Sequence, residues 1–217
     1  MYKAAIFDLD GTVADTLRGI THFVNAATAH FGLGALTEDK VRYYVGDGAD
    51  KLIERTLNDV GGLQQYREIL DYYNMIYKAD PFYQLDAFPG IIEMLDALAA
   101  AGLRLAVLSN KPQYAVAPIC QKLFGDRFDV VQGHVDGLPL KPDTAGVQMI
   151  CKKLDVAPQK ILYVGDTKVD MLTGKGVGAF TVGVTWGFRP RRELAENGAD
   201  LIVDHPDRIT AHVLQNR

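Results

Sequence analysis

Short apolar runs and helical periodicity alternate along most of the chain. The runs have the length of buried strands, and the segments between them repeat apolar residues at the spacing of an amphipathic helix. Strands are expected at residues 4–6, 103–108, 129–132, 161–164, 179–184 and 201–203. Helices are expected from Pro89 to about Gly102 and at 113–124, 143–154 and 170–177. This alternation predicts an α/β fold, in which a parallel sheet carries helices on both faces.

The segment from residue 16 to about 85 interrupts the alternation. It contains helical patterns at 16–31, 38–45, 49–60 and 63–78, and no convincing strand. Thr37 is a candidate N-cap, and Gly61 would close the third helix. We therefore expect two domains: a catalytic core formed by residues 1–15 and 86–217, and an all-helical cap at 16–85. An insertion directly after the first strand is expected to act as a lid that excludes water and selects the substrate.

Two carboxylates follow the first predicted strand. Asp8 and Asp10 belong to the sequence Phe7-Asp8-Leu9-Asp10-Gly11-Thr12. Because loops at the carboxyl ends of parallel strands form the crevice in which ligands bind, this pair is expected at an active site. Side chains alternate along an extended chain, so both carboxylates are expected to face the same side. The purely structural alternative is a capping pair at a strand-to-helix turn.

Three further polar segments follow later strands of the core. Ser109 and Asn110 end the second core strand, where a hydroxyl and the backbone amides can donate hydrogen bonds to a phosphate oxygen. Lys141 follows the next strand and can supply a positive charge to the same anion. Asp166 and Asp170 follow the fourth strand. Taken singly, these residues would be turn residues, solvated charges or helix caps, but their shared position at strand ends favours one site.

Four carboxylates and a phosphate dianion in one crevice would repel one another unless a cation is present. A ligand set made of oxygen atoms, with no neighbouring His or Cys in the sequence, favours a hard divalent ion that keeps several waters. The sequence therefore predicts a magnesium site rather than a zinc site.

The composition is that of an ordinary globular protein. Of 217 residues, 48% are hydrophobic and 23% are charged, and the formal net charge is -4. Since the basic residues are dispersed, neither nucleic acid nor membrane is expected as a partner. The chain opens on a strand rather than a signal segment, which predicts a cytoplasmic location. Cys120 and Cys151 lack metal-ligand spacing and are expected to be core or surface residues.

The four segments together resemble the motifs of the haloacid dehalogenase superfamily, and the resemblance covers the whole chain. It is carried by Asp8-Leu9-Asp10-Gly11-Thr12, Ser109, Lys141 and Gly165-Asp166-Thr167-Lys168-Val169-Asp170. The stretches 45–48, 88–90, 108–112 and 185–189 resemble the phosphoglycolate phosphatase branch of that superfamily. The resemblance implies a Rossmann-like core with a helical cap inserted after the first strand.

The resemblance also implies a magnesium-dependent phosphatase that forms an aspartyl phosphate. Asp8 would attack phosphorus. Asp10 would protonate the leaving oxygen and then take a proton from the hydrolytic water. The metal would be held by the Asp8 carboxylate, the Asp10 backbone carbonyl, Asp166 and Asp170, the last either directly or through water.

The remaining motif residues would bind the phosphoryl group. The resemblance assigns this role to Ser109, Asn110 and Lys141, and Lys141 would also fix Asp8. Thr12 would brace the loop. The bond between Lys141 and Pro142 is expected to be cis, as it is in some relatives.

Asp10 also separates the reaction classes of the superfamily. Relatives that cleave carbon-halogen bonds lack an aspartate at this position, and phosphonate-cleaving relatives replace it. A sugar-phosphate mutase, a pyrophosphatase and a nucleotidase stay open as alternatives. A catalytically silent binding domain would need a motif carboxylate replaced, and none is.

The cap offers a candidate site for a second anion. Gly46-Asp47-Gly48 opens the predicted helix at 49–60, whose free amides could receive a substrate carboxylate, with Lys51 and Arg55 one and two turns in. Alternatively, Asp47 is an N-cap and the two cations belong to a solvated face. The branch resemblance favours 2-phosphoglycolate, a small phosphorylated metabolite, as the substrate. The sequence does not distinguish a monomer from a homodimer.

Overall fold

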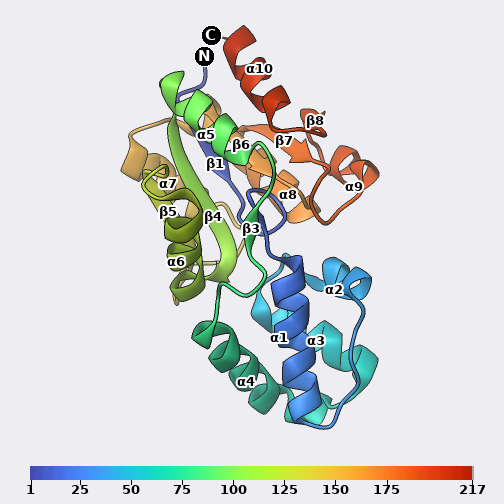
Figure 1. Ribbon diagram of the computed structural model, residues 1–217. Coiled ribbons are helices and arrows are strands. Elements are labelled where there is room, and N and C mark those ends of the chain that lie inside the picture. The colour runs from blue at the N-terminus through green and yellow to red at the C-terminus, as the bar shows by residue number, and fades with distance from the viewer. Residues whose placement is uncertain (217) are drawn as a thin grey trace. The chain divides into compact units, whose positions relative to one another are not determined.

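The computed structural model describes residues 1–216 (Figure 1). The chain divides into two compact units. Residues 1–15 and those from 86 onward form one, called the core unit below, and Thr16–Leu85 form the other, called the helical unit. Within the described residues, no helix is long and apolar enough to cross a lipid bilayer.

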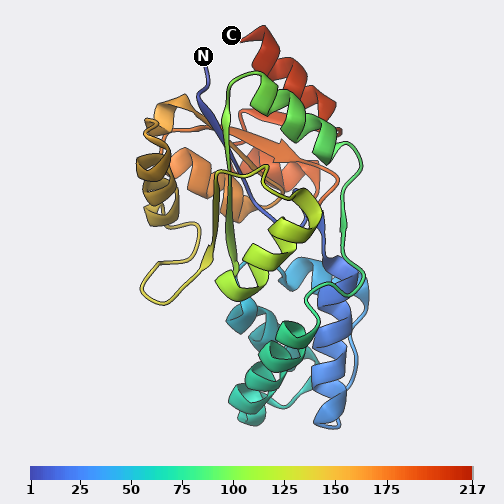
Figure 2. The same cartoon turned by 60° about the vertical axis from the view of Figure 1, so that its left-hand side comes forward.

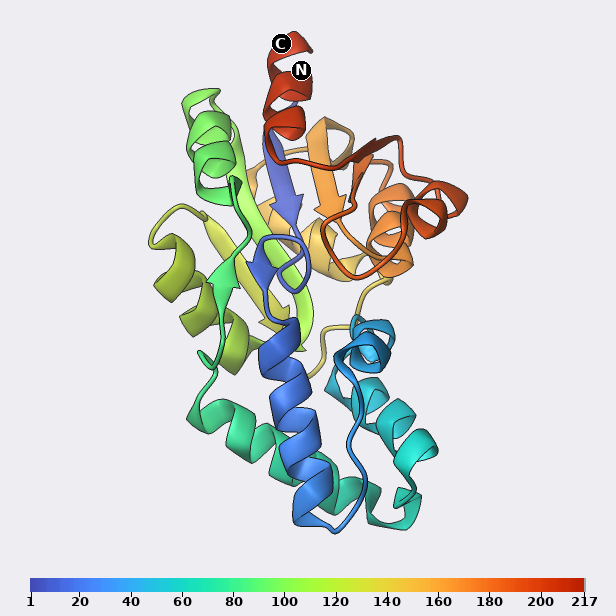
Figure 3. The ribbon, with the colours of Figure 1, turned by 45° about the vertical axis from the view of Figure 1, so that its right-hand side comes forward.

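A six-stranded sheet forms the centre of the core unit, with the strand order β5-β4-β1-β6-β7-β8. Every pair of neighbours is parallel, and the strand arrows share a common direction in Figure 3. The expected parallel α/β fold is thus confirmed. The strands are β1 (Ala4–Phe7), β4 (Arg104–Pro112), β5 (Val130–His134), β6 (Ile161–Gly165), β7 (Phe180–Val184) and β8 (Leu201–Val203).

The strand order changes direction next to β1. From β1 the sheet extends outward through β4 to β5, and the chain then returns to β6 on the other side of β1 and continues through β7 to β8. Ligands of open α/β sheets bind outside the carboxyl ends of the strands where the order changes in this way. The topology therefore makes the ends of β1 and β6 the preferred place for chemistry.

Helices cover both faces of this sheet (Figure 2). On one face lie α5 (Ile91–Ala100) and α6 (Gln113–Phe124), and α10 (Asp207–Gln215) packs against α5. On the other lie α7 (Ala145–Leu154), α8 (Lys168–Gly176) and α9 (Arg191–Glu196). Right-handed crossovers between parallel strands produce this division, because the direction of travel across the sheet reverses after β5. Cys120 of α6 and Cys151 of α7 are both buried, so they are core residues.

The helical unit contains α1 (Leu17–His30), α2 (Glu38–Tyr44), α3 (Ala49–Val60), a short 3-10 turn η1 (Leu63–Gln65) and α4 (Tyr66–Ala79). α1 presents Ile20, Phe23, Val24 and Ala27 on one buried face, at helical spacing. The ring of Phe23 meets that of Tyr77 from α4, with centroids 5.1 Å apart. These contacts give the helical unit its own apolar core.

The helix ends of this unit follow the expected capping residues. Thr37 accepts a 3.4 Å hydrogen bond from the Lys40 backbone at the start of α2. Gly61 ends α3 with a φ of +86°, a conformation that favours glycine. The N-cap of α3 is Gly48 rather than Asp47.

The two connections to the helical unit pair with each other inside the core unit. β2 (Ala14–Asp15) and β3 (Asp86–Ala87) form a two-stranded antiparallel sheet. Ala14 faces Ala87, and Asp15 faces Asp86. The residues that leave the core and those that return to it are therefore held side by side.

Several element boundaries differ from the sequence-based expectation. β4 continues to Pro112, so Ser109 and Asn110 lie within the strand rather than at its end. Its pairing with β5 shifts register between Leu108 and Pro112. α5 begins after an N-cap at Gly90, not with a first turn at Pro89. The elements β2, β3, α9 and α10 were not expected, because two-residue strands and short terminal helices carry little periodic signal.

Candidate active site

The loop after β1 turns tightly around a buried leucine. Leu9 is fully buried, its carbonyl accepts hydrogen bonds from the backbone of Val13 and Ala14, and the carboxylates of Asp8 and Asp10 flank it. Gly11 has a φ of +81°, and a Cβ there would lie 2.4 Å from Oδ2 of Asp166. Only glycine fits this turn without displacing the Asp166 carboxylate.

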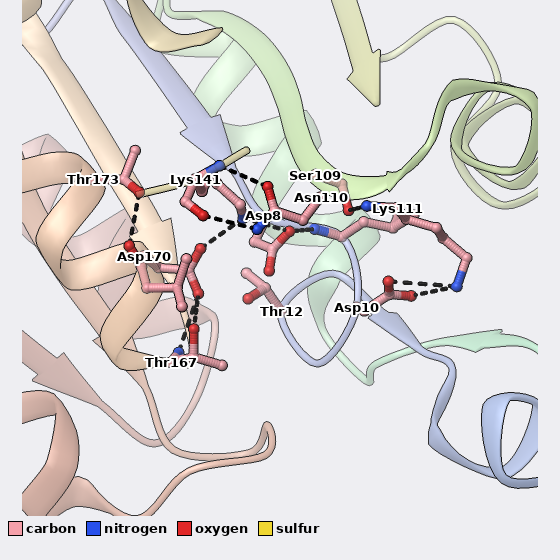
Figure 4. Close-up of polar contacts among 12 residues, drawn as sticks. Asp8, Asp10, Thr12, Ser109, Asn110, Lys111, Lys141, Thr167, Asp170 and Thr173 are labelled. Carbon is pink, nitrogen blue, oxygen red and sulfur yellow. Dashed lines mark hydrogen bonds and ion pairs between the residues drawn. The ribbon is translucent and has the colours of Figure 1, made fainter. Parts of the chain in front are cut away.

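Lys141 lies between two carboxylates (Figure 4). Its Nζ is 2.9 Å from Oδ1 of Asp8 and 2.8 Å from Oδ1 of Asp170, and all three side chains are buried. Burial alone would lower the pKa of the Lys141 ammonium, but Asp170 and Asp8 raise that pKa well above its ordinary value. Lys141 is therefore a permanently charged link between two segments of the site.

The backbone of Lys141 is fixed by Asn110. The amide nitrogen of the Asn110 side chain donates to the Lys141 carbonyl at 3.1 Å, and its Oδ1 accepts from the Lys141 backbone at 2.7 Å. The bond between Lys141 and Pro142 is cis, as expected. The side chain of Asn110 therefore orients Lys141, a role that sequence reasoning did not assign to it.

Besides the contact of Asp170 with Lys141, further hydrogen bonds hold the carboxylates of Asp166 and Asp170. Thr12 donates to Oδ1 of Asp166 at 2.9 Å, and the Phe188 backbone donates to Oδ2 at 2.7 Å. Thr167 donates to Oδ2 of Asp170 through its backbone, at 3.1 Å, and through its hydroxyl, at 2.8 Å. Thr167 and Asp170 form a capping box, so α8 begins earlier than expected and Asp170 serves both the helix and the site.

Three buried carboxylates face one another at this point. Asp8, Asp166 and Asp170 each offer an oxygen atom within 4.8 Å of the other two. Burial raises the pKa of Asp8 to about 7, aided by Asp170 and Asp10 against the attraction of Lys141. Burial also raises the pKa of Asp166 well above its ordinary value, again with help from Asp170 and Asp8. Because one ammonium cannot neutralise three carboxylates, this group of oxygen ligands fits a hard divalent cation.

A second ion pair lies on the opposite side of Asp8 from Asp170 (Figure 4). Nζ of Lys111 lies 3.1 Å from Oδ1 and 3.4 Å from Oδ2 of Asp10. The Lys111 backbone donates to the hydroxyl of Ser109 at 3.2 Å, and that serine is buried. Asp10 thus points to a partner different from that of Asp8, although both carboxylates come from one loop.

Lys111 was not among the residues chosen from the sequence. It stands two residues after Ser109, in a stretch noted only for its branch resemblance. The available signal was its place at the carboxyl end of β4, next to residues already assigned to the site. A lysine at such a position would usually be solvated, whereas the side chain of Lys111 is only 8% exposed.

Lys51 and Arg55 belong to the helical unit, and both are paired there. Nζ of Lys51 is 2.6 Å from Glu54, and both side chains are largely exposed. Arg55 lies 2.6 Å from Asp47 and also donates to the carbonyl of Tyr44. The Asp47 carboxylate therefore pairs with the Arg55 guanidinium instead of capping α3.

The topology and the carboxylate and lysine pairs are those of an α/β enzyme, and the three buried carboxylates form a group that could hold a divalent cation. A sequence profile of the haloacid dehalogenase-like hydrolases matches residues 5–184. The chain belongs to this family.

Named relatives cover nearly all of the chain. It is 33% identical to the phosphoglycolate phosphatase of Yersinia pseudotuberculosis, with 97% of this chain and 89% of that protein covered. It is 31% identical to phosphoglycolate phosphatase 1 of Pseudomonas aeruginosa, with 94% and 76% covered. The crystal structure of a predicted phosphoglycolate phosphatase from Haemophilus somnus superposes with a TM-score of 0.90 at 28% identity, covering 97% of both chains. The family and these relatives indicate a hydrolase of the phosphatase type.

Proposed function

We propose that this protein is a magnesium-dependent phosphatase that hydrolyses a small phosphate monoester through an aspartyl phosphate, with 2-phosphoglycolate as the substrate. The observation that carries the proposal is the placement of the Asp8 carboxylate, which contacts Lys141 and lies in the same group of acidic side chains as Asp166 and Asp170. The names of the relatives at about 30% identity support the substrate.

In the first step, an oxygen of Asp8 attacks phosphorus in line, and the bond from phosphorus to the ester oxygen breaks. Asp10 gives its proton to the leaving oxygen. In the second step, water attacks the phosphorus of the aspartyl phosphate, Asp10 takes a proton from that water, and the Asp8 carboxylate is released. Asp10 is thereby returned to its protonated form with inorganic phosphate as the product.

The other residues hold the transferring group. Lys141 fixes Asp8 and offers its positive charge to the phosphoryl oxygens. The Ser109 hydroxyl binds a phosphoryl oxygen. Asn110 contributes through its backbone amide, since both polar ends of its side chain contact Lys141. Thr12 acts indirectly, because its hydroxyl orients Asp166.

The divalent cation of the proposal would be held by Asp8, the Asp10 carbonyl, Asp166 and Asp170. Bound there, magnesium would supply positive charge that neutralises the phosphoryl oxygens. Thr12, Thr167 and the Phe188 backbone keep the carboxylates of this set in position by hydrogen bonds.

The substrate assignment requires a cation for the carboxylate of phosphoglycolate. Lys51 and Arg55 are the candidates from the sequence, and to bind substrate they would have to release their present partners Glu54 and Asp47. Substitution of each cation by methionine tests its part in carboxylate recognition.

The test is a comparison of kcat/KM for 2-phosphoglycolate, glucose 1-phosphate, pyrophosphate and nucleoside monophosphates, with magnesium present. We expect phosphoglycolate to be preferred. A tenfold preference for one of the other compounds would replace phosphoglycolate by that compound and leave the phosphatase assignment standing. Conversion of a sugar 1-phosphate to its 6-phosphate without release of phosphate would favour the mutase alternative instead.

A further inference from the structure

Lys111 is a buried cation for which the proposed chemistry has no direct use. Its side chain is 8% exposed and that of Asp10 is 12% exposed, so both charges of the pair are largely removed from water. Burying a lysine is costly unless its charge is compensated. Lys141 already serves Asp8 and Asp170, whereas Lys111 forms an ion pair with Asp10.

The backbone of Lys111 is held by its neighbours. Its backbone donates to Ser109, and its carbonyl faces Gly133 of β5 so closely that a Cβ on that glycine would lie 2.7 Å from the carbonyl oxygen. The Gln113 side chain accepts a hydrogen bond from the Gly133 backbone. Since β5 anchors both sides of this position, the ammonium is presented from a fixed strand rather than from a mobile loop.

The proposed role of Asp10 implies that the Lys111 ammonium can reach the carboxylate of the substrate. A carboxylate that serves the leaving oxygen must contact that oxygen. In a phosphorylated 2-hydroxy acid such as phosphoglycolate, the carboxylate carbon is only two bonds from the leaving oxygen. A cation that touches Asp10 is therefore within reach of the substrate carboxylate when the leaving oxygen touches Asp10. The ammonium of Lys111 is such a cation.

We propose that Lys111 binds the carboxylate of the substrate and is the residue that makes the site prefer phosphorylated hydroxy acids to phosphate esters that lack a carboxylate. The inference rests on the proposed function, because it concerns the same reaction site. It moves carboxylate recognition from Lys51 and Arg55 of the helical unit to a residue of β4.

The experiment measures kcat/KM for two substrates of similar size, 2-phosphoglycolate and 2-hydroxyethyl phosphate, with saturating magnesium. The quantity of interest is the ratio of the two values, which reports recognition of the carboxylate. Lys111→Met removes the charge and keeps the length, and Lys111→Arg keeps the charge. Lys111→Gln provides a second uncharged variant in case Lys111→Met does not fold. Lys153→Met replaces an exposed lysine of the core unit and serves as the control.

We expect wild type to prefer phosphoglycolate, and Lys111→Met to lower the ratio by about 10- to 100-fold, because a hydrogen bond between charged groups is lost. Lys111→Arg should retain most of the ratio, and Lys153→Met all of it. A residue that only orients Asp10 would lower both kcat/KM values by the same factor and leave the ratio unchanged, and that result would overturn the inference.

Two further outcomes separate this inference from the proposed function. If Lys51→Met or Arg55→Met collapses the ratio while Lys111→Met preserves it, the carboxylate is bound by the helical unit and the Lys111 assignment is wrong, although the phosphoglycolate assignment stands. If wild type hydrolyses neither ester, nor an activated aryl phosphate, the proposed function fails and the inference fails with it.

Discussion

The ammonium of Lys141 donates to Oδ1 of Asp170 at 2.8 Å, with both side chains buried. The other oxygen of the same carboxylate caps α8 through Thr167. A single side chain thus joins the first turn of a helix to the lysine that holds Asp8. The arrangement couples the local stability of α8 to the geometry around the proposed nucleophile.

Asp8→Asn should lower kcat by on the order of 10⁴ or more, because an amide cannot attack phosphorus. The fold should persist, since the substitution removes a charge from a position where burial already disfavours it. Steady-state kinetics and circular dichroism check both statements, with the exposed Asp136→Asn as control. Activity of Asp8→Asn within tenfold of wild type would contradict the covalent mechanism.

Asp10→Asn should impair the hydrolysis of alkyl phosphates most severely. Alkyl alcohols are poor leaving groups and need the proton, whereas an activated aryl group leaves with little help. The measurement is kcat for an alkyl and an activated aryl phosphate in wild type and variant. If both substrates lose activity by an equal factor, Asp10 is not the acid of the first step.

Chelation of divalent ions should abolish activity, and magnesium should restore it. Calcium should inhibit, because it accepts a looser coordination shell than magnesium does. Activity is assayed after treatment with a chelator and after each ion is added back. Full activity in excess chelator would contradict the role given to Asp8, Asp166 and Asp170.

The metal-free protein should lose stability as the pH rises from about 4 to above 7. Asp8 has a pKa of about 7 in the folded state, well above that of an unfolded aspartate, so the folded state binds more protons in this range. The free energy of unfolding therefore falls with increasing pH, by a few kcal/mol if Asp8 acts alone. Asp166, whose pKa is also raised, should act in the same direction.

Thermal unfolding in a chelator between pH 4 and 8 measures this loss. Asp8→Asn should reduce the dependence, since one of the two carboxyl groups with a raised pKa is gone. Magnesium should raise Tm more at pH 8 than at pH 5, because a bound cation favours the ionised carboxylates. A Tm that is constant across the range would show that the cluster carries no excess negative charge.

Gly187→Ala should disturb the proposed cation site, although Gly187 is not one of its ligands. A Cβ at this position would lie 2.3 Å from the Gly11 carbonyl and 2.4 Å from Cβ of Asp166, so either the loop or the carboxylate must shift. We expect a loss of about 1–3 kcal/mol in stability and at least tenfold weaker activation by magnesium. Gly34→Ala is the matched control, because its nearest neighbour would be 3.8 Å away. Equal behaviour of the two variants would refute this packing argument.

The sheet could be predicted from the sequence because its strands are buried on both faces. Fully apolar runs such as Ala4–Phe7 stand out from the amphipathic helices between them. The pairing of β2 with β3 could not be predicted, since Ala14 and Ala87 are far apart in sequence and their strands have two residues each. α9 follows a proline and has six residues, fewer than two helical turns, which is too short for a periodic pattern.

The site was predictable to the extent that it depends on strand ends. Asp8, Lys141 and Asp166 could be placed together because parallel strands end at one edge of the sheet. The contact between Lys111 and Asp10 could not, because it spans 101 residues and depends on the register shift at the end of β4. The double contact of Asn110 with the Lys141 backbone was hidden for the same reason.

The pairing of β2 with β3 brings together the two points at which the helical unit is inserted into the core unit. Because Ala14 faces Ala87 and Asp15 faces Asp86, residues 16–85 leave and re-enter at adjacent points. A tight turn of a few residues could bridge those points, as it does in an ordinary β-hairpin. A different insert grafted between Asp15 and Asp86 would therefore leave the reacting groups of the core unit in place.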